Sequence, residues 1–168
     1  MKKKTFVVGM LIGGLAGLAG AAQAASGGRF PAATCVVASE DRPFADVHGG
    51  GWQYTSTSGD LDLSCPFVDG NSWDKSQIDE LIVQGFDPDQ YTHMWAQPCV
   101  DYTTGGGACG TQFTNGPAST TGASTISVYP GNTWSSNSAH YGYLGVRLPP
   151  KIGTTMSRLY GYKLVDNP

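Results

Sequence analysis

Charged residues are few in this 168-residue chain, and the basic ones are the fewest, with 10 Lys and Arg against 13 Asp and Glu. Three of the basic residues are Lys2, Lys3 and Lys4, so the chain from residue 25 onward keeps seven basic and thirteen acidic side chains, a net charge near −6. No basic cluster occurs from residue 25 onward. A surface of this sign repels nucleic acid and anionic lipid, so we expect no nucleic-acid partner.

Long apolar runs are also lacking. The run Phe6–Ala19 is shorter than the roughly 20 residues that a membrane span needs. It follows the three lysines and precedes Ala22-Gln23-Ala24, whose small residues suit signal-peptide cleavage near Ala24. We therefore expect residues 1–24 to be a signal peptide, the mature protein to be secreted or periplasmic, and no membrane span. A lipid anchor is disfavoured because no cysteine ends the run.

The four cysteines, Cys35, Cys65, Cys99 and Cys109, lack the CxxC spacing and paired histidines of zinc sites. An even number of cysteines in an exported chain predicts disulfide bonds, and three pairings are open. We favour Cys99–Cys109, which closes a local loop, and Cys35–Cys65, which ties the N-terminal segment to a neighbouring strand.

A nucleophile motif is missing as well. His48-Gly49-Gly50-Gly51 is similar to the oxyanion-hole loop of lipases and esterases, but the chain has no GxSxG nucleophile elbow. The glycines are better interpreted as a turn before a strand at Trp52. A triad assembled in space from His93 or His140 with Ser and Asp stays open. A small secreted hydrolase is therefore the least favoured alternative, and we predict no catalytic residue.

The EF-hand calcium motif is absent, yet several oxygen donors lie along turns. The residues that could hold a structural calcium ion are Asp69, Asn71, Asp74, Asp87 and Asp89. Asp and Asn are also common turn formers on their own account, which is the interpretation we favour. No other cofactor is expected.

Short segments of alternating polarity, separated by glycine-rich turns, fill the rest of the chain. The clearest is 61–68, where Leu61, Leu63, Cys65 and Phe67 share one face. Further strands are expected at 34–39, 51–58, 91–102, 124–130, 141–149 and 157–165, with a short edge strand around Phe113. Segment 76–87 fits a helix or a strand, and we favour a strand from about residue 79. About eight or nine strands predict an all-β fold, a single antiparallel β-sandwich or jelly roll stapled by disulfides.

The predicted domain covers 33–168 and follows a flexible leader at 25–32. The turn Ser58-Gly59-Asp60 predicts a hairpin between 51–58 and 61–68. In the last strand, alternation predicts one face with Tyr160, Tyr162 and Leu164 and the opposite face with Leu159 and Val165.

Aromatic residues are plentiful, with 4 Trp and 8 Tyr. Most of them, Trp52 and Trp95 included, are expected to fill the core or cover strand faces. Trp73 and Trp134 lie in the polar contexts "NSWDK" and "NTWSS", where burial is less assured. Because indole and phenol rings stack on sugars, we predict a ligand-binding surface that contains Trp73, Trp134, Tyr129 and Tyr141.

Several short motifs carry a family resemblance: Cys35, Cys65-Pro66, the turn Asp87-Pro88-Asp89, Cys99, "YLGVRLPP" at 143–150 and "GYKLV" at 161–165. With the signal peptide, this arrangement resembles a group of small exported bacterial β-sandwich proteins. The last motif is one residue longer here than in the group's pattern. The resemblance implies an exported β-sandwich and carries over no catalytic residue.

Two functions remain in view besides the hydrolase. We expect an exported non-catalytic binding module, with a glycan or a protein as partner and carbohydrate favoured. The alternative is a structural or self-assembling protein of the cell envelope or extracellular space. Low charge and the Thr-, Ser- and Gly-rich segment 103–124 suggest this alternative, in which the chain associates with itself.

Overall fold

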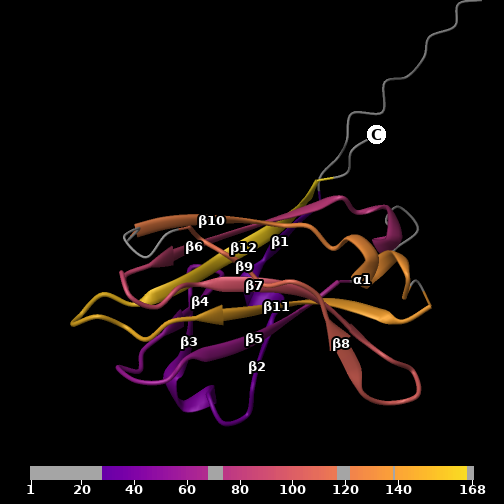
Figure 1. The fold of residues 1–168 in the computed structure, drawn as a ribbon. Coiled ribbons are helices and arrows are strands. Elements are labelled where there is room, and N and C mark those ends of the chain that lie inside the picture. The colour runs from indigo at the N-terminus through magenta and orange to yellow at the C-terminus, as the bar shows by residue number, and fades with distance from the viewer. Residues whose placement is uncertain (1–27, 68–73, 117–121, 138, 166–168) are drawn as a thin grey trace, which may run out of the picture.

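A computed structural model describes residues 28–67, 74–116, 122–137 and 139–165 as two antiparallel sheets packed face to face (Figure 1). Sheet A has the order β10 (Gly122–Val128), β6 (Glu80–Asp87), β12 (Ser157–Val165), β4 (Gly51–Tyr54) and β3 (Ala45–His48), and β1 (Arg29–Pro31) also pairs with β12. Sheet B has the order β2 (Val36–Val37), β5 (Leu61–Pro66), β11 (Tyr141–Leu148), β7 (Trp95–Asp101) and β8 (Gly107–Cys109), and β9 (Phe113–Thr114) also pairs with β7. The predicted all-β sandwich is confirmed.

Helical segments are short and lie in the connections. They are η1 (Ala32–Thr34), η2 (Arg42–Phe44), η3 (Lys75–Gln77) and α1 (Gly131–Ser135). None of the helices in the described ranges is long and apolar enough to cross a membrane. The ambiguous segment 76–87 is resolved in favour of a strand, because η3 ends at Gln77 and β6 begins at Glu80.

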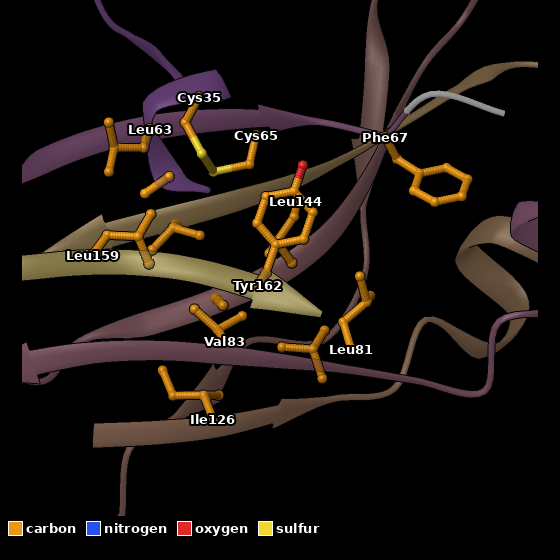
Figure 2. Packing of buried hydrophobic residues seen from close by; sticks show 14 of the residues in the cluster. Cys35, Leu63, Cys65, Phe67, Leu81, Val83, Ile126, Leu144, Leu159 and Tyr162 are labelled. Carbon is orange, nitrogen blue, oxygen red and sulfur yellow. A yellow bond between two sulfur atoms is a disulfide. The ribbon is translucent and has the colours of Figure 1, made fainter. Parts of the chain in front are cut away.

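The core lies between the sheets and follows the predicted alternation (Figure 2). In β5, Leu61, Leu63 and Cys65 are buried, whereas Ser64 on the other face is exposed. Neighbouring strands contribute in the same way, with Leu144, Val146 and Leu148 from β11, Leu81 and Val83 from β6, and Ile126 from β10. Period-two alternation therefore identified the core-facing side of most strands.

One prediction about strand faces is wrong, because β12 contains an irregularity. Its pairing register with β6 shifts between Leu159 and Gly161, as in a β-bulge. The extra residue places Leu159 on the same buried side as Tyr162 and Leu164, while Tyr160 is 49% exposed. A bulge changes which face a side chain occupies, and strict alternation cannot anticipate it.

The predicted hairpin between 51–58 and 61–68 is also wrong. β4 pairs with β3 and β12 in sheet A, whereas β5 pairs with β2 and β11 in sheet B, so the turn at Ser58-Gly59-Asp60 crosses between the sheets. The tight hairpin is formed by β3 and β4, where Gly49 and Gly50 have φ of 60° and 82°. Two successive positive φ values suit the right-handed twist of a two-residue hairpin. The HGGG motif is thus a turn before the Trp52 strand, as predicted.

Residues 28–32 differ from the predicted flexible leader. Arg29, Phe30 and Pro31 form β1, which pairs with the C-terminal half of β12. Phe30 stacks on Tyr162 with ring centroids 5.0 Å apart. Residues 25–27 of the predicted leader lie outside the described residues.

Both favoured disulfides are confirmed. Cys35, just before β2, bonds to Cys65 in β5, and Cys99 in β7 bonds to Cys109, its direct cross-strand partner in β8. Cys65 is fully buried, whereas Cys109 is exposed. The first bond therefore lies in the core, and the second fastens an edge strand to the outside of sheet B.

Candidate functional site

Trp134, which the sequence suggested as an exposed binding residue, is fully buried. It lies in α1, where its indole N–H donates to the carbonyl of Cys99 at 3.0 Å and its ring stacks on Phe67 at 5.4 Å. An indole with no exposed surface cannot stack on a ligand, so this prediction is wrong and Trp134 is a core residue. Trp73 lies outside the described residues.

The two tyrosines predicted to bind ligand are both exposed but lie at different places. Tyr129 follows β10, is 56% exposed and contacts Phe113 edge-on. Tyr141 begins β11 and is 74% exposed. Tyr141 lines the hollow described below, and Tyr129 does not.

This hollow, which we call the sheet-B groove, lies on the outer face of sheet B and has a volume of about 560 Å³. Its lining residues are Val36, Ser64, Pro66, Phe67, Asp101, Tyr141, Gly142 and Tyr143. Alternation in β11 builds it: Leu144, Val146 and Leu148 point into the core, so Tyr141 and Tyr143 point outward. A groove of this size, mostly apolar with a few polar groups, is typical of small-ligand sites.

The register of three strands brings the groove's polar groups to its tyrosines. Tyr141 is the cross-strand partner of Asp101 in β7, and Tyr143 is the partner of Pro66 in β5. The pKa of Tyr143 is raised, mainly by burial and further by the negative charge of Asp101. The phenol of Tyr143 therefore stays neutral at physiological pH and can both donate and accept hydrogen bonds.

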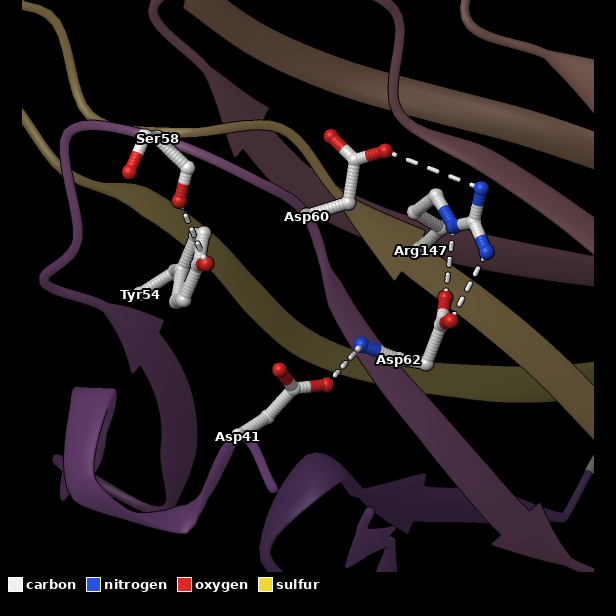
Figure 3. A network of polar contacts seen from close by, with 6 residues as sticks. All are labelled: Asp41, Tyr54, Ser58, Asp60, Asp62 and Arg147. Carbon is white, nitrogen blue, oxygen red and sulfur yellow. Dashed lines mark hydrogen bonds and ion pairs between the residues drawn. The ribbon is translucent and has the colours of Figure 1, made fainter.

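Further along the same outer face, Arg147 of β11 forms a charged cluster with two aspartates (Figure 3). Its guanidinium donates two hydrogen bonds to the Asp62 carboxylate at 2.6 and 2.7 Å and lies 3.6 Å from Asp60. The ring of Trp95 lies beneath it, with 4.8 Å between the guanidinium carbon and the ring centroid. These bonds with Asp62 raise the pKa of Arg147, against a lowering by burial.

Asp62 connects this cluster to the loop that precedes β3. Its backbone N–H donates to the Asp41 carboxylate at 3.2 Å (Figure 3). In the loop that crosses from β4 to β5, the Tyr54 hydroxyl donates to the Ser58 carbonyl at 3.0 Å. Cross-strand bidentate Arg–carboxylate pairs hold both side chains in one geometry. The cluster therefore forms one fixed end of an outward strip that runs along β11.

The strip extends from Tyr141 to Arg147, a distance of about 20 Å at roughly 3.3 Å per residue. The sequence analysis named Tyr141 among the aromatic residues of a possible binding surface, but it did not name Tyr143, Ser64, Asp101 or Arg147 for such a surface. Alternation did place Asp62 and Ser64 on one outward face. The missing information was the strand register, because only the pairing of β5 and β7 with β11 shows that Ser64, Asp101 and Tyr143 lie around one groove.

The aspartates considered for calcium are used in their own turns. Both carboxylate oxygens of buried Asp87 accept hydrogen bonds, from the backbone N–H groups of Asp89 and Met94 and from the Asn115 amide. Asp89 accepts from the Tyr91 N–H and the Thr92 hydroxyl. These bonds hold 88–94 as a loop, which is why β7 begins at Trp95 and not at Tyr91 as predicted.

Asp74 is occupied in a similar way, because it accepts from the Ser76 N–H and caps η3. Asp69 and Asn71 lie outside the described residues. Within the described residues, no three His, Cys, Asp or Glu side chains gather in a way that could hold a metal ion. In the described part of the chain, Asp74, Asp87 and Asp89 are thus turn-forming residues.

The histidines are placed on separate elements. His48 ends β3 beside the glycine turn, His93 lies in the loop before β7, and His140 precedes β11. His140 contacts Tyr102 edge-on, and its Nδ1 accepts from the Thr103 N–H at 3.5 Å. Through these contacts, His140 packs against the loop that follows β7.

The sheet-B groove is consequently the site with the best combination of volume, aromatic surface and polar groups. It is lined by residues of four strands of one sheet, β2, β5, β7 and β11, so its geometry does not depend on a single loop. In comparisons with known proteins, no protein-family model and no curated sequence matches this chain.

Proposed function

We propose that this protein is an exported, non-catalytic module that binds carbohydrate in the sheet-B groove. The observation that carries the proposal is the pair Tyr141 and Tyr143, two outward phenol rings on one strand, with Ser64 and Asp101 beside them. A phenol ring offers an apolar face and a polar tip, which suits the alternating apolar and hydroxylated surfaces of a sugar. Ser64 and Asp101 add hydrogen-bonding groups at the rim.

The shape of the surface favours an extended glycan chain over a single buried sugar. The groove opens on a sheet face, and the outward strip that begins in it at Tyr141 ends at Arg147, beside Trp95, about 20 Å away in total. Several sugar rings in a row could therefore contact β11 at once. A multi-ring ligand would gain affinity from contacts that are individually weak.

Export is part of the same proposal. Two disulfides are typical of proteins that fold in an oxidising compartment. We assign residues 1–24 as the signal peptide that directs the chain there, and we place the protein in the group of small exported bacterial β-sandwich proteins that its motifs resemble. Sequencing the N-terminus of the exported protein tests the cleavage near Ala24.

The binding proposal is tested by applying the exported, oxidised protein to a broad glycan array and comparing two single variants. Tyr141→Ala removes an exposed ring from the groove, and Tyr160→Ala removes an exposed ring from the outside of sheet A. We expect saturable binding that Tyr141→Ala weakens at least tenfold and that Tyr160→Ala leaves unchanged. A blank array, or equal effects of the two variants, contradicts the proposal.

A second candidate is self-assembly, which edge strand β3 favours. β3 ends the strand order of sheet A, and Phe44 and Val47 at this edge are both 47% exposed. An unpaired strand edge with exposed apolar residues is a template for pairing with another chain. Light scattering across a concentration range tests it: Val47→Lys should abolish any oligomer, and a protein that stays monomeric throughout excludes this candidate.

A further inference from the structure

The charge inside the sheet-B groove is of one sign. Among its eight lining residues, Asp101 is the one with a carboxylate, and none is Lys, Arg or His. Asp101 is exposed on β7 and lies beside Tyr141 and Tyr143. The groove therefore presents a negative charge next to Tyr141, its direct cross-strand partner, and near Tyr143.

Two basic residues on or next to β11, Arg147 and His140, have other partners. Arg147 lies six residues along β11 and is bound by Asp62 and Asp60. His140 precedes Tyr141, but its Nδ1 accepts a hydrogen bond from the Thr103 backbone and its ring rests on Tyr102. Among the described residues, the contacts of Arg147 and His140 are thus with groups other than Asp101.

A negative carboxylate beside aromatic rings has a specific ligand preference. An ammonium group gains from pairing with the carboxylate and from lying over a ring face, whereas a carboxylated sugar is repelled by Asp101. The net charge near −6 of the mature chain acts in the same direction at longer range.

We propose that the groove selects glycans that carry free amino groups, that is, 2-amino sugars with an ammonium ion, over neutral, N-acetylated or uronic-acid glycans. This inference rests on the proposed carbohydrate binding and deepens it by naming the class of glycan that is bound. In this arrangement the sugar ring stacks on Tyr141 or Tyr143 and its ammonium pairs with Asp101. From the typical strength of one exposed ion pair and one cation–π contact, we expect a preference of about five- to tenfold over the neutral sugar.

Three β-1,4-linked oligosaccharides of equal length test the inference: oligomers of glucose, of N-acetylglucosamine and of glucosamine. Calorimetric titrations at about pH 5.5 keep the amino groups protonated and an exposed carboxylate ionised. Wild-type protein should bind the glucosamine oligomer most tightly. The preference should shrink as ionic strength rises, because exposed charges are screened.

Three single variants separate the charge of Asp101 from its shape and from the total charge of the protein. Asp101→Asn should reduce the glucosamine preference, the ratio of the affinities for the glucosamine and glucose oligomers, to less than twofold, because the amide keeps hydrogen-bonding groups at this position but carries no charge. Asp101→Glu should retain the preference. Asp46→Asn removes one exposed carboxylate from β3 on sheet A and should change nothing.

The outcomes distinguish this inference from the function on which it rests. Equal affinities for the three oligomers, or a preference that survives Asp101→Asn, overturn the inference and leave carbohydrate binding standing. Absence of binding to all three oligomers overturns the inference, and a blank glycan array in addition overturns the proposed function. Thermal unfolding of each variant confirms that its fold is intact.

Discussion

Replacement of Trp134 by alanine should destabilise the fold severely without acting on a binding surface. A buried tryptophan removes roughly 150–250 Å² from water, and at about 25 cal/mol per Å² this amounts to about 4–6 kcal/mol. Measured Trp→Ala changes in cores cost about 3–5 kcal/mol. Because Trp134 is fully buried and also donates to the Cys99 carbonyl, we expect a loss of about 4 kcal/mol.

Two further variants sharpen this test. Trp134→Phe keeps most of the ring that stacks on Phe67 but removes the N–H donor, so it should cost about 1–2 kcal/mol. Tyr141→Ala, at an exposed position, should change the free energy of unfolding by less than about 0.5 kcal/mol. Urea unfolding of the oxidised proteins, followed by far-UV circular dichroism, gives all three values. The burial argument is refuted if Trp134→Ala unfolds within about 1 kcal/mol of wild type.

Two other perturbations have expected outcomes that follow from covalent loops and from burial. On the chain-entropy model the Cys35–Cys65 bond, with a sequence separation of 30, contributes about 3.6 kcal/mol, and Cys99–Cys109, with a separation of 10, about 2.7 kcal/mol. Urea unfolding of the two double-alanine variants should show the larger loss for the first bond, and the reverse order contradicts the loop argument. Burial raises the pKa of Tyr162 above its usual 10.0, so the stability it contributes is complete below about pH 10 and is lost as pH rises toward the folded-state pKa. Tyr162→Phe should flatten the fall of the urea midpoint above about pH 10, and an unchanged slope there contradicts this linkage.

The fold was predictable where local pattern and burial agree. In β5 and in β11 every second residue is apolar, and those residues face the core. The Cys99–Cys109 disulfide was predictable because the two cysteines are close in the chain and their bond closes a local loop. Prediction failed where the sheet that a strand joins depends on pairing with strands distant in the sequence. The turn at Gly59 suits a hairpin, yet β4 finds its partners in sheet A.

The candidate site was less predictable because it depends on register and on helix orientation. Trp134 has polar neighbours in sequence, but the single turn of α1 points its indole into the sandwich, where it bonds to Cys99. Conversely, nothing local marks Asp101 as a partner of Tyr141, because forty residues separate them and only the pairing of β7 with β11 brings them together. The polar neighbours of Tyr141 could therefore not be predicted from the sequence.

Carbohydrate binding in the sheet-B groove is tested most directly by mapping the surface that a glycan touches. Isotope-labelled protein would be titrated with the tightest-binding oligosaccharide and followed by backbone and aromatic NMR shifts. Saturable shifts centred on Ser64, Asp101, Tyr141 and Tyr143, and absent at Tyr160 on the outside of sheet A, are the predicted result. Shifts confined to another surface, or none at saturating oligosaccharide, would contradict the account.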